Sequence, residues 1–140
     1  MGQQENIAVQ KNIGQAVNSG HLEGLKLAFD DHVKDHDPAS GQAPGPEGFI
    51  EFYRMMRTSF PDLTVAVDHM VADDENVAIA YTMTGTQKGE FLGIAPTGKK
   101  IHARGMQIAR FERGKIVERW GSSDELGILK QLGVTVEPQR

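Results

Sequence analysis

Two residues near the C-terminal end of the chain carry side chains that can do chemistry together. The stretch GKIVERWGSSDELG, from Gly114 to Gly127, places the only tryptophan, Trp120, four residues before Asp124. A carboxylate can act as a general base when an apolar pocket raises its pKa towards neutrality, and an indole ring is one such apolar wall. A lone tryptophan near a strand end is also a common core residue, so both interpretations of Trp120 are open.

Asp124 also has a structural interpretation. The letters SSDE predict a capping box, with Ser122 as the N-cap of a helix and Glu125 at its third position. An acidic residue in the first turn of a helix also interacts favourably with the helix dipole. The local sequence alone therefore favours helix capping over catalysis for this segment, although the box itself does not require Asp124.

The segment DDHVKDHD places His32 and His36 four residues apart among acidic side chains. If this segment were helical, both imidazoles would lie on one face, as in some metal sites. A structural metal site needs one or two further ligands, and no HExxH motif or distant partner accompanies the pair. We therefore expect no metal, and we expect His32 to be exposed to solvent.

Three arginines, Arg104, Arg110 and Arg119, lie on predicted strands. They could hold an anionic group of a substrate. Arginine on a sheet more often forms cross-strand ion pairs, and Glu112 and Glu118 are suitable partners. The ion pairs are the favoured interpretation.

The elements that must position these residues follow from hydrophobic periodicity. Apolar residues at helical spacing predict three helices, at about 4–18, 22–29 and 49–60. Pro61 ends the third helix, because a residue that precedes proline avoids helical geometry. The proline- and glycine-rich segment 37–48 is predicted to be a loop.

After Pro61 the apolar period changes from 3.6 to 2. Alternation predicts four strands, at 63–72, 77–86, 101–112 and 116–122, and a short helix follows at about 125–132. The predicted fold is α+β, with three N-terminal helices packed on one face of a curved four-strand antiparallel meander and a short C-terminal helix. Such a sheet encloses a conical cavity of the kind that binds small ligands.

Composition narrows the class of protein. The 140 residues suit a single domain over 1–140, and a net charge of −4 without a basic stripe argues against nucleic-acid binding. The absence of cysteine excludes disulfides, thiolate metal ligands and a cysteine nucleophile. The N-terminus does not read as a signal peptide, and no apolar run approaches the roughly 18 residues of a membrane span. We expect a cytoplasmic protein that does not bind membranes.

Four segments, in this order, resemble the SnoaL-like polyketide cyclase family of the cone-shaped nuclear transport factor 2-like (NTF2-like) and ketosteroid isomerase-like superfamily. They are DHDP (35–38), GPEGFIEFYRMMRTSFPDL (45–63), GTQKGEFLGIAPTGKKI (85–101) and RFERGKIVERWGSSDELGILKQLG (110–133). The resemblance implies the NTF2-like cone. It also implies an enzyme that closes a ring in an aromatic polyketide ester by intramolecular aldol condensation, without a metal or an organic cofactor.

The resemblance assigns roles to single residues. Asp124 stands where the family has its acid/base aspartate, which reverses the preference above in favour of catalysis. Gln107 matches a glutamine of the family, whereas the histidine expected two residues later is Ala109. By strand parity His102 lies on the opposite face, and it could replace that histidine only if a bulge at Gly105 changed the register.

Four residues complete the predicted substrate-binding set: His36, Tyr53, Gln107 and Trp120. His36 belongs to the DHDP segment and either lines the cavity or forms a structural hydrogen bond.

The absent imidazole leaves three functions open. The first is aldol ring closure of an apolar or aromatic substrate. The second is hydroxylation or isomerisation of a related polycyclic substrate, and the third is non-catalytic binding of a small molecule. We also expect a homodimer that pairs through the exposed face of its sheet.

Overall fold

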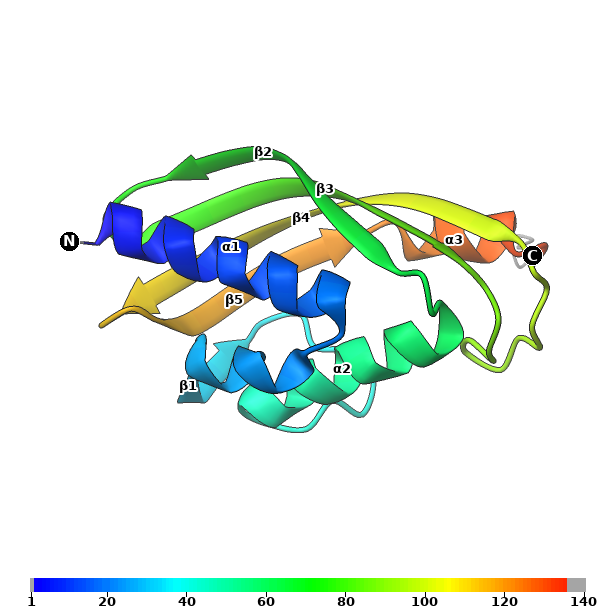
Figure 1. Cartoon of the computed structure of the whole chain (residues 1–140), viewed down its shortest axis with the longest axis horizontal. Helices are drawn as coiled ribbons and strands as arrows, with labels where there is room; N and C mark the ends of the chain where they lie inside the picture. Colours follow the sequence, from blue (N-terminus) through cyan, green and yellow to red (C-terminus); the bar gives the residue numbers. More distant parts are fainter. Residues whose placement is uncertain (1, 136–140) are drawn as a thin grey trace, which may run out of the picture.

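The computed structural model describes residues 2–135, which form an α+β fold in which short helices pack against one curved sheet (Figure 1). The predicted fold class is confirmed. In chain order the elements are α1 (Gln3–Ser19), the 3₁₀ helix η1 (Leu22–Leu27), β1 (Phe29–Asp35), α2 (Pro46–Ser59), β2 (Thr64–Ala72), β3 (Asn76–Thr86), β4 (Lys100–Glu112), β5 (Lys115–Ser123) and α3 (Glu125–Gln131).

The sheet has five strands in the order β1-β5-β4-β3-β2. Strands β2 to β5 form the predicted antiparallel meander, and β1 adds a parallel edge strand beside β5. The sequence reading missed β1 because its two buried residues, Phe29 and Val33, are four apart, a spacing that also suits a helix. The helix predicted at 22–29 is therefore a 3₁₀ helix that ends at Leu27.

Helix α1 faces the sheet with a stripe of buried side chains, Asn6, Gln10, Ile13 and Val17. Two of these four residues are polar, so the apolar pattern of the sequence located the helix and its C-terminal buried residues, Ile13 and Val17, but not Asn6 and Gln10. The helix ends at Ser19 and is capped by Gly20, whose φ of 82° is the left-handed geometry that glycine adopts without strain. Across residues 2–135, no helix is both long and apolar enough to cross a membrane.

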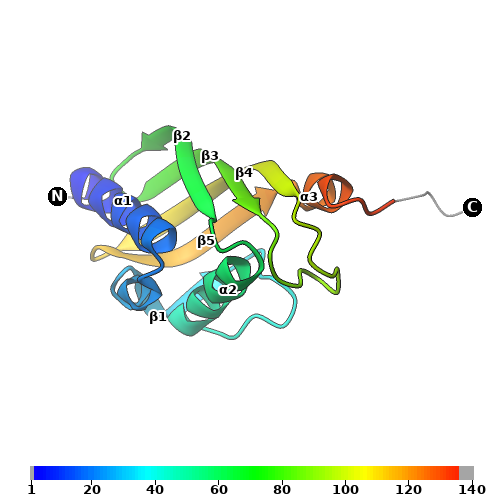
Figure 2. The same cartoon turned by 45° about the vertical axis from the view of Figure 1, so that its right-hand side comes forward.

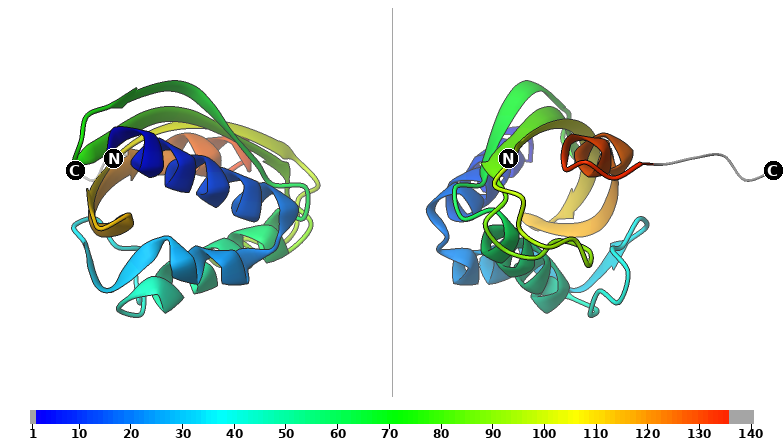
Figure 3. Two further views of the ribbon diagram at one scale, coloured as in Figure 1. Left: turned by 60° about the vertical axis from the view of Figure 1, so that its left-hand side comes forward. Right: turned by 90° about the vertical axis from the view of Figure 1, so that its right-hand side faces the viewer.

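Helix α2 ends at Ser59, immediately before Phe60 and Pro61, as the sequence predicts. It begins at Pro46, three residues before the predicted start and inside the predicted loop, because proline is well suited to the first turn of a helix. The sheet curves around α1, η1 and α2, which cover its concave side, while α3 lies beyond the far end of the meander (Figures 2 and 3).

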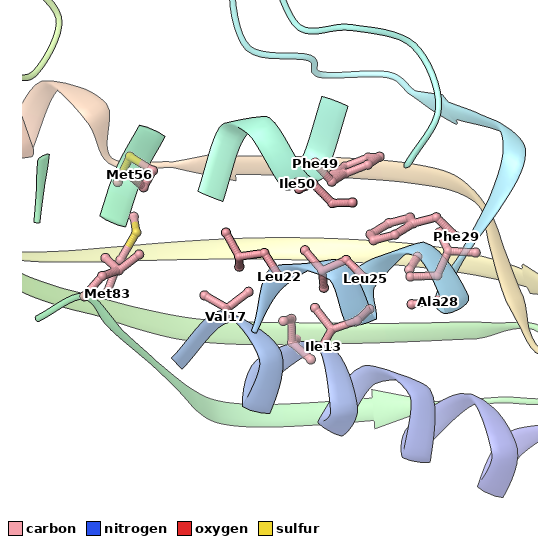
Figure 4. Close-up of a cluster of buried hydrophobic side chains, with 14 of the residues drawn as sticks. Ile13, Val17, Leu22, Leu25, Ala28, Phe29, Phe49, Ile50, Met56 and Met83 are labelled. Carbon is pink, nitrogen blue, oxygen red and sulfur yellow. The ribbon is translucent and has the colours of Figure 1, made fainter. Parts of the chain in front are cut away.

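The hydrophobic core lies between these helices and the concave face of the sheet (Figure 4). Within it the Phe29 and Phe49 rings stack with centroids 4.2 Å apart, joining the start of β1 to α2. This contact fixes the first turns of α2 against the sheet, and α2 in turn places Tyr53 over the concave face.

Candidate functional site

A cavity of about 500 Å³ opens between α2, the end of β1, the middle of β3 and the junction of β5 with α3. The residues that line it are Asp35, Asp37, Pro38, Ala39, Gln42, Phe49, Phe52, Tyr53, Val65, Tyr81, Met83, Arg119, Gly121, Ser122, Ser123, Asp124, Glu125 and Leu126.

Asp124 lies at the rim of this cavity and is the N-cap of α3. Its Oδ1 accepts a hydrogen bond of 2.8 Å from the Gly127 N–H, and its own N–H donates to the Arg104 carbonyl of β4 at 3.0 Å. The predicted capping box is wrong, because β5 continues through Ser123 and the helix starts only at Glu125. One carboxylate therefore both caps the helix and faces the cavity, so capping and catalysis are not exclusive alternatives.

A buried ion pair forms the floor of the cavity beside β5. The Arg119 guanidinium donates through Nη1 to Asp35 at 3.0 and 3.3 Å and through Nε to Gln107 Oε1 at 2.8 Å. The two ion-paired side chains are only 18% and 7% exposed. Gly121 leaves the room that the guanidinium needs, because a Cβ there would lie 2.5 Å from Arg119 Nη2.

The three predicted arginine ion pairs have different outcomes. Arg110 pairs with Glu112 at 2.9 Å and with Glu118 at 2.7 Å, as predicted. Arg119 also pairs with an acid, but its partner is Asp35, because Arg119 points to the concave face, away from Glu118. Among the described residues, Arg104 has no ion pair.

Two phenols, Tyr53 and Tyr81, face the same cavity. Burial is the main cause that raises the pKa of Tyr53 to about 12; Tyr81 and Asp35 add to the effect and Arg119 opposes it. Burial also raises the pKa of Tyr81, again against Arg119. Both phenols therefore stay protonated at neutral pH and can donate hydrogen bonds. The Tyr81 ring covers Gly105, where any Cβ would overlap it.

The structure separates His36 and Trp120 from this cavity. Their rings stack on one another with centroids 4.6 Å apart, and His36 Nε2 lies 2.8 Å from Glu118 Oε2. Hydrogen bonds from His36 and then Arg110 lower the pKa of Glu118. Alternate side chains of β5 point to opposite faces of the sheet, so Glu118 and Trp120 share the convex face while Arg119 faces the cavity.

The cavity side of β4 carries Gln107 and Ala109, with Ala109 fully buried. The β3–β4 register is continuous through Gly105, so no bulge there brings His102 to the concave face. Position 109 therefore carries no imidazole, and His102 does not take the place of the missing histidine on the concave face. His32 is exposed on β1, as predicted, and the strand removes the helical spacing that would have paired it with His36.

The sequence did not predict Asp35 or Tyr81 at this site, and for Arg119 it favoured an ion pair over the binding of a substrate anion. Asp35 was hidden because β1 was not predicted. Tyr81 and Arg119 could have been found from strand parity, since each alternates with residues of the opposite face. Within residues 2–135, no three histidine, aspartate or glutamate side chains are grouped so that they could hold a metal ion.

A curved sheet that wraps around helices and encloses a ligand-sized cavity defines the NTF2-like class, and solved structures of that class superpose on this chain. TsrD of Streptomyces laurentii matches with a TM-score of 0.86 and 23% identity over 94% of this chain and 97% of its own. The profile of the SnoaL-like polyketide cyclases matches residues 7–132, and the chain therefore belongs to this family.

Two further solved structures are similar. IdmH of Streptomyces antibioticus, a proposed polyketide cyclase, is 32% identical with a TM-score of 0.79, covering 92% of this chain and 99% of its own. AclR of Streptomyces galilaeus, a proposed hydroxylase, is 26% identical with a TM-score of 0.81, covering 93% and 96%. Among curated proteins, no significant match is found.

Proposed function

We propose that this protein is an enzyme that closes a ring in an aromatic polyketide or a related ester by general acid/base-catalysed intramolecular aldol addition, without a cofactor. One observation carries the proposal: a carboxylate, Asp124, lines the same cavity as a guanidinium and two protonated phenols. The SnoaL-like family membership and the likeness to IdmH support a substrate of the polyketide class.

The proposed chemistry begins with a proton transfer. Asp124 removes a proton from a substrate carbon that lies next to a carbonyl group, and the electron pair moves to the carbonyl oxygen as an enolate. Donors on the cavity wall stabilise that oxygen, and Arg119, Tyr53 and Tyr81 are the donors available there. The enolate carbon then attacks a second carbonyl of the same molecule, and the resulting alkoxide takes up the proton.

Gln107 has a positioning role in this proposal. Its Oε1 accepts from Arg119 Nε, while Asp35 holds Nη1. These two partners fix the plane of the guanidinium, and within residues 2–135 its Nη2 has no hydrogen-bond partner. An oriented donor of this kind costs little reorganisation when negative charge develops on the substrate.

The test uses purified protein with a panel of aromatic polyketide esters, followed by product analysis. Aldol ring closure leaves the substrate mass unchanged. The proposal expects a cyclised product with the wild-type protein and loss of the enzyme-dependent rate with Asp124→Asn. An Asp124→Asn variant that cyclises the substrate at the wild-type rate would remove Asp124 from the mechanism.

A second candidate function is hydroxylation or isomerisation of a related polycyclic substrate. Two observations favour it: position 109 is alanine, so the imidazole partner expected of a cyclase is absent, and AclR is a proposed hydroxylase. The same assay separates the two enzymes, because hydroxylation adds an oxygen atom to the product mass. If the panel binds but no product forms, the protein is a small-molecule-binding member of the fold.

We also propose a homodimer that forms through the convex face of the sheet. Val71, Ala78, Ile108 and Trp120 lie side by side across four strands on that face. Val71 is 56% exposed and Ile108 45%, while the neighbouring Met106 is 65% exposed. A second copy related by a two-fold axis would present the same apolar row, so the two rows would cover each other.

Sedimentation of the wild type and of Ile108→Glu tests this proposal. The matched control is Leu27→Glu, because Leu27 is 78% exposed but lies on η1, on the opposite side of the sheet from the convex face. We expect a dimer for the wild type and the control and a monomer for Ile108→Glu. A wild-type protein that sediments as a monomer at micromolar concentration would refute the dimer.

A further inference from the structure

Helix α1 buries one amide group that finds no partner in the protein. Gln10 is 4% exposed and belongs to the stripe of α1 that faces the sheet. Among the described residues its Oε1 is buried without any hydrogen-bond partner, and it is the one such side-chain atom. The amide of Asn6, one turn earlier in the same stripe, donates to the Asp74 carbonyl at 3.1 Å.

An unpartnered buried acceptor is unusual and needs a reason. Folded proteins pair the large majority of their buried polar atoms, and a buried atom without a partner costs roughly 1–3 kcal/mol. A leucine or methionine at this position would fill the stripe without that cost. We therefore expect Gln10 Oε1 to accept a hydrogen bond from a bound ligand.

Gln10 lies on the wall of a second, small cavity of about 40 Å³ between α1 and the sheet. Tyr53 and Tyr81 line both this cavity and the large one, as do Phe49 and Val65. This small, inner cavity therefore adjoins the large cavity, and the two phenols belong to the walls of both. A volume of roughly 10–15 Å³ already holds one water-sized group, so the inner cavity has room for a substituent and not for a second ring.

We infer that Gln10 forms an inner subsite that binds a hydroxyl substituent of the ligand, while the ring that carries the substituent occupies the large cavity. A hydroxyl group fits because it donates to Oε1 and is small enough for the space. A carbonyl oxygen has no proton to donate, and an ammonium group would lose its hydration among the apolar side chains that make up most of the wall. The hydroxyl can also accept from the amide nitrogen, so it suits either orientation of the amide.

This subsite deepens the proposed function and rests on it, because the ligand is taken to be the phenolic or hydroxylated substrate of the large cavity. It makes Gln10 a residue that determines specificity. Substrates with a hydroxyl at the end that enters first would bind in preference to analogues that carry a methyl group there.

Two probes of nearly equal shape test the inference: 2-naphthol and 2-methylnaphthalene, titrated by calorimetry into the full-length protein. We expect the wild type to prefer the naphthol by about tenfold, the ratio expected when one buried acceptor gains a donor. Gln10→Met should lose this preference while it binds 2-methylnaphthalene at least as tightly. The matched control is Gln15→Met, an exposed residue on the same helix, which should keep the wild-type ratio.

Gln10→Met removes a buried polar atom that has no partner in the protein, so the variant should be at least as heat-stable as the wild type. A thermal melt of the variant therefore shows whether its loss of preference for 2-naphthol could come from unfolding. Equal affinities of the wild type for the two probes would overturn the inference. So would a crystal structure in which bound 2-naphthol directs its hydroxyl group away from Gln10.

The binding test does not depend on catalysis. Asp124→Asn should show the wild-type ratio of affinities, since residue 124 lies at the rim of the large cavity and does not line the inner one. If the acid/base proposal fails, Asp124→Asn stays active and the ratio is unchanged. If the subsite fails, the ratio is near one in the wild type while Asp124→Asn is inactive.

Discussion

Replacing Asp124 by three different residues separates its two roles, because each replacement keeps or removes a different property. Asparagine and serine are as good as aspartate at an N-cap, so both can accept the 2.8 Å hydrogen bond from the Gly127 N–H. Alanine cannot, and the loss of an N-cap costs about 1 kcal/mol. For a chain of this size that corresponds to a fall of about 3–5 °C in the melting temperature.

Activity should follow a different order. All three variants lack the carboxylate, and removal of a general base typically lowers the rate by about 10²–10⁴-fold. We therefore expect Asp124→Asn and Asp124→Ser to melt close to the wild type and yet to be as inactive as Asp124→Ala. The measurements are thermal melts and initial rates on the best ester of the panel.

The reasoning has a clear point of failure. If activity follows the melting temperature, so that asparagine and serine restore turnover and alanine does not, then Asp124 acts only by holding the start of α3. Glu125→Gln is the matched control, because Glu125 lines the same rim and is acidic but does not cap the helix. It should keep both stability and turnover.

Three further predictions test other parts of the structure. Arg119→Met should destabilise the fold by about 3 kcal/mol in chemical denaturation, because it leaves the buried Asp35 carboxylate unpaired, and adding Asp35→Asn should recover part of that loss. Because the pKa of Tyr53 is raised to about 12 in the folded protein, its contribution to stability is complete below about pH 10 and is lost as the pH rises towards 12. Between about pH 10 and 12 the free energy of unfolding should therefore fall by on the order of 2 kcal/mol more in the wild type than in Tyr53→Phe. Equal falls in the two proteins would contradict the raised pKa of Tyr53. Gly14→Ala should stabilise α1 by about 0.5–1 kcal/mol, since a Cβ there meets no atom within 4 Å, and a fall in melting temperature would show that the helix is packed more tightly than described.

Much of the fold follows from sequence periodicity alone. The change of period at Pro61 separated the helical half from the meander, and the four predicted strands agree with β2 to β5 to within one residue at each end. The edge strand β1 was missed because a short parallel strand has no hairpin partner in the sequence, and its buried Phe29 and Val33 match a helical spacing. This one error also hid Asp35, which reaches Arg119 only because β1 pairs with β5.

The site was harder to predict than the fold because it depends on which face of a strand each side chain occupies. Gln107 and Tyr53 were predicted as site residues and do lie on the concave side. Gln107 lines the inner cavity, and Tyr53 lines both cavities. Trp120 and His36 were also selected, but they stack on the convex face. The N-cap was predicted at Ser122, two residues before its position at Asp124. The end of β5 depends on its pairing with β4, which the local sequence does not reveal. Gln10 carried no signal, because a glutamine in a helix is ordinarily a surface residue.

The most direct test of the acid/base account is a crystal structure of Asp124→Asn with an intact substrate from the ester panel bound in the cavity. The account predicts that the acidic carbon lies at about 3–3.5 Å from the side chain of residue 124, with the carbonyl oxygen directed at Arg119 or at one of the two phenols. A substrate whose acidic carbon lies against Asp35 instead, with residue 124 out of reach, would contradict it.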